Sequence, residues 1–224
     1  MADAAATMPG RAPRQGRRGS GRRGPETREA ILRAAIELFA KRGYHATSMR
    51  ALASAARVQP AAIYHWYPSK EAILVELQDD FMDRLTEKVE DAMAACESPA
   101  LKLAAAVREH VVFHGLHRLA AFVTDSEIRA LAPARRRALV AQRDSYQDIF
   151  IGQIRGGVKD GSLRVSDPRI AAYAILLECT GVALWFDPSG KLGLDRVAEL
   201  HVELVLRSLG AGDELVAEAT EDGA

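Results

Sequence analysis

The chain has 224 residues, of which 48% are hydrophobic, and its 30 basic residues balance its 30 acidic residues. This apolar content excludes a wholly disordered chain, and the zero net charge argues against a protein that simply coats nucleic acid. The charge is nevertheless uneven, since residues 1–24 are rich in Arg and residues 211–224 carry acids without a base. We expect a flexible Arg-rich arm at 1–24 and a disordered acidic tail at 211–224.

Two features favour a cytoplasmic protein over a membrane or secreted one. Cys96 and Cys179 lie far apart and form no CxxC pair, so no disulfide scaffold is predicted and a reducing cytosol fits. The longest apolar run, from Ile170 to Phe186, has about 17 residues, which is the lower limit for a membrane span, and it contains Glu178. The run is therefore interpreted as a helix buried on several sides, and no membrane partner is expected.

Helical periodicity begins near residue 25, and caps and breakers divide the chain into helices from there. Gly43 is placed to end the first helix, Pro60 suits the first position of a short third one, and Ser69 the N-cap of a long fourth. Further helices are predicted from Ser98 onwards and at roughly 118–131, 133–159, 167–186 and 194–209. No segment alternates at period two, so the predicted fold class is all-α with about nine helices.

Short helices followed by a long one, within about 60 residues, are the outline of a helix-turn-helix module. Its third helix must enter a major groove about 12 Å wide, which favours small and polar residues on the outer face. The candidate DNA-binding residues are Thr47, Ser48, Arg50, Gln59, Ala61, Ala62, Tyr64, His65, Tyr67 and Lys70. The alternative is a plain helical bundle, with Leu52, Ile63 and Trp66 packing in its core in either case.

A longer pattern points to a family. The stretch from Thr27 to Ala53, which contains LFAKRGYHATS, and the stretch from Val58 to Leu74, which contains IYHWYPSKEAIL, resemble the DNA-binding domain of the TetR family of repressors. The resemblance covers residues 26–86. It implies a dimer on palindromic double-stranded operator DNA, phosphate contacts from Thr47, Tyr64, His65 and Lys70, and base contacts from the third helix.

Residues 87–210 are expected to form a ligand-binding and dimerisation domain. The helices predicted at 167–186 and 194–209 carry more apolar surface than one chain can cover, so they predict a homodimer built on an intersubunit four-helix bundle.

This half also resembles a TetR subgroup that represses fatty-acid and sterol breakdown and senses acyl-CoA thioesters. The resemblance rests on EIRAL from Glu127, RDSY from Arg143, GGVKDGSL from Gly156 and WFDPSGKL from Trp185. It implies a repressor released by a small-molecule effector of that class, with activation left open. The implied ligand-binding residues are Phe113, Leu116, Phe122, Arg129, Arg136, Arg143, Tyr146, Phe150, Leu177 and Trp185. The alternative to ligand binding is that the aromatic residues pack in the core and that the arginines lie on solvated helix faces.

A rival hypothesis starts from His110, His114 and His117, which share one face of a helix and favour a metal sensor or an enzyme. A pocket-lining or solvent-facing stripe is the other interpretation, and a helical interaction protein is a third class. The sequence contains no HExxH, P-loop, dinucleotide fingerprint or nucleophile elbow, so neither catalytic residues nor a metal or cofactor are predicted.

The Arg-rich arm is left with two interpretations, an auxiliary DNA contact and a solvated tail.

Overall fold

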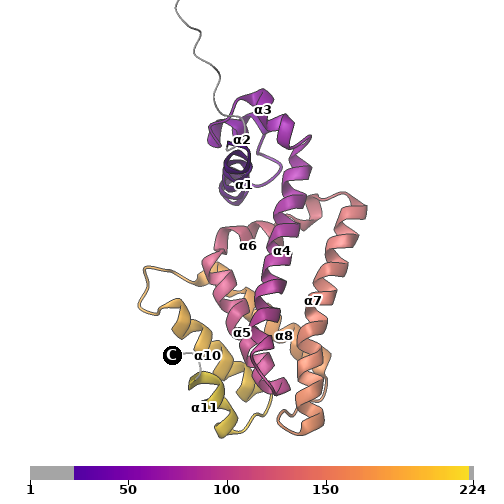
Figure 1. The fold of residues 1–224 in the computed structure, drawn as a ribbon, viewed down its shortest axis with the longest axis vertical. Helices are drawn as coiled ribbons and strands as arrows, with labels where there is room; N and C mark the ends of the chain where they lie inside the picture. Colours follow the sequence, from indigo (N-terminus) through magenta and orange to yellow (C-terminus); the bar gives the residue numbers. More distant parts are fainter. Residues whose placement is uncertain (1–22, 222–224) are drawn as a thin grey trace, which may run out of the picture.

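The computed structural model describes residues 23–221, which form eleven α-helices and one short 3-10 helix without any strand (Figure 1). The predicted all-α fold class is confirmed. The expected arm lies outside the described residues, except that the first helix already begins at Arg23. Three helices form one end of the molecule: α1 (Arg23–Arg42), α2 (Met49–Ala55) and α3 (Pro60–Trp66).

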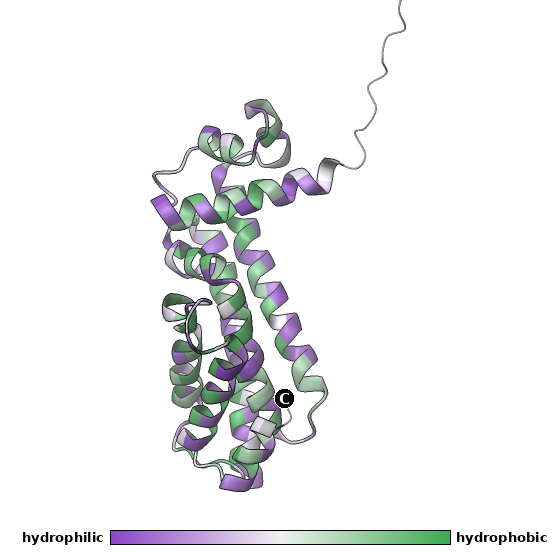
Figure 2. Ribbon diagram, turned by 90° about the vertical axis from the view of Figure 1, so that its left-hand side faces the viewer, coloured by the Kyte–Doolittle hydropathy of each residue, from purple (hydrophilic) through white to green (hydrophobic). Residues whose placement is uncertain are grey.

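The long helix α4 (Lys70–Ala94) runs from this end into the larger helical body (Figure 1). Within the body, α5 packs against α4, α7, α8 and α10, so the core is built around it. Figure 2 shows α1 lying across the end of this bundle. The body consists of α5 (Pro99–Leu116), α6 (Arg118–Ser126), η1 (Ile128–Ala130), α7 (Pro133–Asp160), α8 (Pro168–Thr180), α9 (Val182–Trp185), α10 (Leu194–Ser208) and α11 (Asp213–Glu221).

Side-chain caps fix the starts of several helices where the sequence predicts them. The hydroxyls of Ser69 and Ser98 accept hydrogen bonds from the N–H groups of Ala72 and Leu101, at 3.1 and 3.2 Å. These bonds satisfy backbone donors that the first turn of a helix leaves free. At the end of α1, Gly43 has φ +80°, a conformation that glycine adopts without a steric penalty.

Two predicted helices are shorter than expected. The helix predicted at 167–186 divides at Gly181 into α8 and α9, and a Cβ on Gly181 would lie 3.0 Å from the carbonyl oxygen of Glu178. A side chain at this position would require the neighbouring backbone to give way by a few tenths of an ångström. The helix predicted at 118–131 ends at Ser126 and continues as the 3-10 helix η1.

The prediction of a disordered tail is wrong for residues 213–221, which form α11. Val216 and Ala219 lie one turn apart and are buried against the body. Arg207 of α10 forms an ion pair with Asp213 at 2.8 Å. The acidic composition of the tail hides this short apolar stripe, which is enough to hold the helix in place.

The sequence predicts neither a membrane span nor a disulfide scaffold. Among residues 23–221, no helix is long and apolar enough to cross a membrane. Both cysteines are free, and they differ in environment: Cys96 is half-buried at the end of α4, whereas Cys179 is buried within α8. Burial raises the pKa of the Cys179 thiol well above its ordinary value.

Candidate DNA-binding surface and ligand cavity

The turn between α2 and α3 brings the two helices together over a shared core. Leu52 of α2 and Ile63 of α3 are fully buried, and the N–H of Val58 donates to the carbonyl of Ala53 at 2.9 Å. Arg57 takes a left-handed φ of 56°, which reverses the chain direction in a few residues. This packing fixes one face of α3 inward and leaves the opposite face open.

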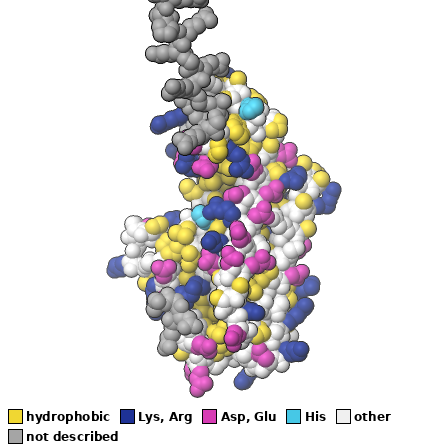
Figure 3. All heavy atoms as spheres, in the orientation of Figure 1, with side chains coloured by type: hydrophobic (Ala, Val, Ile, Leu, Met, Phe, Trp, Pro, Cys, Tyr) yellow, Lys and Arg dark blue, Asp and Glu magenta, His cyan; other side chains and the backbone are white. Residues whose placement is uncertain are grey.

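The outward face of α3 carries the residues that the sequence predicts for it. Gln59, Ala61 and His65 are exposed, Ala62 is half-buried, and Tyr64 is 54% exposed. The N-cap Ser48 and the neighbouring Arg50 are also exposed at the start of α2. Figure 3 shows this end of the molecule as a mixture of hydrophobic, uncharged and basic surface, with carboxylates gathered lower down the same face.

Two predicted DNA contacts are turned inward instead. Thr47 is 3% exposed, and its hydroxyl donates to the carbonyl of Gly43 at 2.9 Å. Tyr67 is equally buried, and its hydroxyl donates to a carboxylate oxygen of Glu76 at 2.9 Å. Both hydroxyls are therefore occupied within the module, and their predicted role as DNA contacts is corrected to a structural one.

Lys70 holds the start of α4 to the loop before α2. Its ammonium donates to the carbonyls of Tyr44 and Thr47 at 2.6 and 2.7 Å and lies 4.2 Å from the centre of the Tyr44 ring. Desolvation lowers the pKa of Lys70. The predicted phosphate contact of Lys70 is thus replaced in this structure by bonds to the protein's own backbone.

The same loop connects the helix-turn-helix end to the body. The N–H of Tyr44 donates to a carboxylate oxygen of Glu127 at 3.1 Å, and Glu127 lies at the end of α6. Helix α1 packs against α6 as well. The orientation of α2 and α3 therefore depends directly on the position of α6.

A cavity of about 730 Å3 opens between α6, α7, α8 and α9, and we call it the outer cavity. Its apolar lining comes mainly from Phe122, Tyr173, Leu176, Leu177 and Leu184. Polar groups of Asp125, Ser126, Arg143, Gln147 and Thr180 share the wall. A mostly apolar space with a few polar groups of this size is typical of a small-molecule site.

Arg143 stands at the boundary between the outer cavity and a smaller one. Its guanidinium donates to the carbonyl of Thr124 and to Asp125, both at 3.0 Å, so it is held at the C-terminal end of α6. The inner cavity, about 130 Å3, shares Asp125, Arg143, Gln147, Leu176 and Thr180 with the outer one. It reaches down to His110, His114 and Tyr146.

The ligand-binding residues predicted from the sequence are only partly brought together. Phe122, Arg143 and Leu177 line the outer cavity, and Tyr146 lines the inner one. The remaining six do not line either cavity in the described chain: Phe113 and Phe150 are core, and Leu116, Arg129, Arg136 and Trp185 are exposed. Tyr173 and Thr180 were missed, and their one-turn spacing from the apolar residues of α8 is the signal that would have found them.

His110 and His114 of α5 and His117, which follows the end of α5, do not converge on a common point. The rings of His110 and His114 stack with centroids 4.1 Å apart, whereas Nε2 of His117 lies 3.4 Å from Arg84 on α4. Within residues 23–221, no group of three or more His, Cys, Asp or Glu side chains is arranged to hold a metal ion. The geometry gives the metal hypothesis no support.

Comparison with family models divides the chain into the same two parts, the helix-turn-helix end and the helical body. Residues 31–77 match the model of bacterial regulatory proteins of the tetR family, and residues 96–209 match the model of the tetracyclin repressor-like C-terminal domain. The HTH-type transcriptional repressor KstR2 of Rhodococcus jostii (strain RHA1) is 30% identical over 194 residues, which is 86% of this chain and 94% of KstR2. The fatty acid metabolism regulator protein of Bacillus subtilis (strain 168) is 29% identical over 147 residues, 65% of this chain and 75% of the relative.

A solved structure shares the fold over most of its length. The crystal structure of AibR in complex with isovaleryl coenzyme A and operator DNA is 26% identical, with a TM-score of 0.73, and the match covers 80% of this chain and 97% of AibR. The fatty acid metabolism regulator among these relatives agrees with the predicted resemblance to regulators of lipid metabolism. The chain belongs to the tetR family of bacterial regulatory proteins.

Proposed function

We propose that this protein is a transcriptional repressor that binds operator DNA as a homodimer and leaves it when an acyl-CoA thioester occupies the outer cavity. The observation that carries the proposal is the open face of α3, where Gln59, Ala61, Tyr64 and His65 project from a helix anchored by the buried Ile63. Small and polar side chains on a short exposed helix suit a major groove.

Charge restricts how DNA can approach. Exposed carboxylates follow α4 away from the helix-turn-helix end, and Figure 3 shows acidic side chains along this part of the molecule. They include Asp80, Asp83, Glu87, Glu90 and Asp91. Because these carboxylates repel phosphate, the α3 end is the surface that DNA can approach most favourably.

The proposed homodimer uses an apolar face of α8, α9 and α10. Leu177 is 78% exposed, and Leu184, Trp185 and Leu204 are more than half exposed as well; Leu177 and Leu184 also line the outer cavity, so the partner subunit would border its opening. Several large exposed apolar side chains on neighbouring helices are unfavourable in water and are typical of a protein interface. A symmetric pair formed through this face would present two α3 helices, which need a separation of about 34–36 Å to reach successive major grooves.

The proposed effector class rests on the outer cavity and on the relatives. The cavity volume of about 730 Å3 lies in the range of small-molecule sites. The related AibR was crystallised with isovaleryl coenzyme A. A thioester whose acyl group enters the apolar space, with its coenzyme A part at the open side, agrees with both observations.

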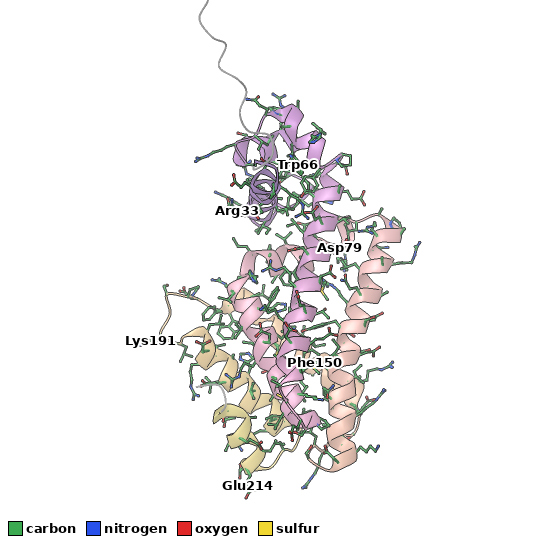
Figure 4. All side chains as sticks on the ribbon, in the orientation of Figure 1. Arg33, Trp66, Asp79, Phe150, Lys191 and Glu214 are labelled. Carbon is green, nitrogen blue, oxygen red and sulfur yellow. The ribbon has the colours of Figure 1, made fainter. Side chains whose placement is uncertain are left out.

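The DNA-binding part is tested with Tyr64→Ala and a matched control, Lys191→Ala. Tyr64 is exposed on α3, so its loss should weaken binding about tenfold if it contacts the operator. Lys191 lies in the loop before α10, far from α3 (Figure 4), and its loss should leave affinity unchanged. Fluorescence anisotropy on the genomic fragment that the protein selects gives the measurement. Equal affinity of Tyr64→Ala and the wild type would contradict the proposed surface.

A further inference from the structure

The inner cavity ends in a polar floor inside an otherwise apolar bundle. His110 and His114 are both buried in α5, and the Phe81 and Phe150 rings pack at their edges. His114 is only 3% exposed, yet it lines the inner cavity together with Tyr146 and Thr180. Buried polar groups are normally paired, so the hydrogen bonds of each ring indicate what the cavity offers to a ligand.

The two ring nitrogens of His110 are both engaged by the protein. Nδ1 lies 2.8 Å from the hydroxyl of Tyr146, and Nε2 lies 3.1 Å from the hydroxyl of Thr180. Hydroxyls can donate or accept, so His110 is satisfied in either neutral form. It leaves no free nitrogen for a ligand.

His114 differs, because only one of its nitrogens is engaged. Nδ1 lies 2.9 Å from the backbone carbonyl of His110, and a carbonyl can only accept, so the proton resides on Nδ1. Burial lowers the pKa of His114, which keeps the ring neutral. Nε2 is then an unprotonated acceptor, and no donor among residues 23–221 bonds to it.

We infer that the inner cavity recognises a hydroxyl group on the buried end of the ligand, with its O–H donating to Nε2 of His114. A hydroxyl can donate to Nε2 and also accept from the unpaired Nε–H of Arg143 on the same cavity wall, whereas a ketone oxygen can only accept and an alkyl group would leave both atoms unsatisfied. The volume of about 130 Å3 corresponds to about four water-sized groups, enough for the end of a molecule that fills the outer cavity. This inference rests on the proposed function, because it assigns the chemistry of the effector's inner end.

The test uses three probes of one shape, cyclohexanol, cyclohexanone and cyclohexane, which exceed the inner cavity and would extend into the outer one. Nitrogen-15 NMR of histidine-labelled wild-type protein, without DNA or coenzyme A thioester, reports on each imidazole. Cyclohexanol should bind about 3- to 10-fold more tightly than cyclohexanone and should move the Nε2 resonance of His114. His201 is an internal control, because its Nδ1 also contacts a backbone carbonyl, that of Val197 at 2.7 Å, but it lines neither cavity.

The variant His114→Phe retains an aromatic ring and removes the acceptor. In this variant the preference for the alcohol over the ketone should be lost. A proton found on Nε2 of the wild type, or equal binding of alcohol and ketone to it, would overturn the inference.

Because the probes act without DNA, failure of the two proposals can be told apart. A repressor that acyl-CoA thioesters release but that shows no alcohol preference refutes the hydroxyl recognition alone. A protein with the alcohol preference that no thioester releases refutes the proposed effector class alone.

Discussion

At the scale of single residues, the turn between α2 and α3 depends on a conformation that its occupant does not favour. Arg57 has φ 56°, where the Cβ of an L-residue crowds the backbone at a cost of about 1–2 kcal/mol. Glycine avoids this cost, although it also makes the unfolded chain more flexible.

We therefore expect Arg57→Gly to raise the free energy of unfolding by roughly 0.5–1 kcal/mol. Arg57→Ala is the control, because it removes the same guanidinium but keeps the Cβ, and it should give no such gain. Urea unfolding of the two variants beside the wild type is the measurement. A gain of equal size in both would assign the effect to charge instead of backbone conformation.

Individual side chains also show what could not be predicted from the sequence. The types and spacing of Thr47, Tyr67 and Lys70 are sufficient to recognise the module. Their direction depends on partners far along the chain or on a neighbouring turn, such as Glu76 for the Tyr67 hydroxyl and the Tyr44 carbonyl for Lys70. A local pattern contains no information about those partners, so a residue that holds the module together and one that contacts DNA look alike.

At the scale of elements, two of the three glycines in α7 have opposite surroundings. A Cβ on Gly157 would come within 2.6 Å of Cγ of the buried Leu163, in the segment that returns after α7. A Cβ on Gly152 would meet nothing within 4 Å. The same substitution therefore tests close packing at one position and helix propensity at the other.

Gly157→Ala should lower the free energy of unfolding by about 1–3 kcal/mol, since Leu163 must move. Gly152→Ala should raise it by up to about 1 kcal/mol, because alanine favours the helix. Thermal or urea unfolding measured in parallel gives both values. A loss of stability at Gly152, or none at Gly157, would contradict the packing described for this end of α7.

Helix boundaries were predictable wherever a capping residue or a proline at the first position sets them, as Ser69, Ser98 and Pro60 do. The sequence did not predict the division between α8 and α9 at Gly181, nor the formation of helix α11. Each depends on contacts with other helices, such as the burial of Val216 against the body. Tyr173 and Thr180 of the cavity lining were missed as well, because the lining is shared among four helices and the spacing along α8 marks only its own face.

At the scale of the whole molecule, a short chain of contacts joins the outer cavity to the DNA-binding end. Arg143 on the cavity wall bonds to Thr124 and Asp125 at the end of α6. Two residues later, Glu127 accepts from the N–H of Tyr44, whose carbonyl bonds to Lys70. A ligand that displaces Arg143 would therefore move the segment that orients α2 and α3.

Glu127→Ala should weaken this coupling. DNA affinity without ligand is expected to stay within about threefold of the wild type. The loss of affinity caused by a releasing CoA thioester should shrink by about 0.5–2 kcal/mol. Titrations of operator DNA with and without the thioester measure the coupling. Asp187→Ala, at an exposed position in the loop before α10, is the control. Full release of the Glu127 variant would show that the signal takes another route.

The proposed dimer face can be tested by placing a charge on it. Leu204 on α10 is 55% exposed within the apolar face, and Leu192, in the loop before α10, is 50% exposed. Leu204→Glu should weaken dimerisation at least tenfold, because an unpaired carboxylate would be buried at the contact. Leu192→Glu should leave it unchanged. Analytical ultracentrifugation would detect the difference, and an intact Leu204→Glu dimer would place the interface elsewhere.

The contrast between the two cysteines makes the natural chain suitable for spectroscopic labelling. A maleimide reacts with the thiolate, and the buried, raised-pKa thiol of Cys179 offers little of it, whereas Cys96 is partly accessible. A spin label would therefore attach mainly at the end of α4 remote from α3, giving one reporter per subunit without any substitution. The distance between two such reporters in a pair of subunits would follow any tilting of α4 as an effector enters.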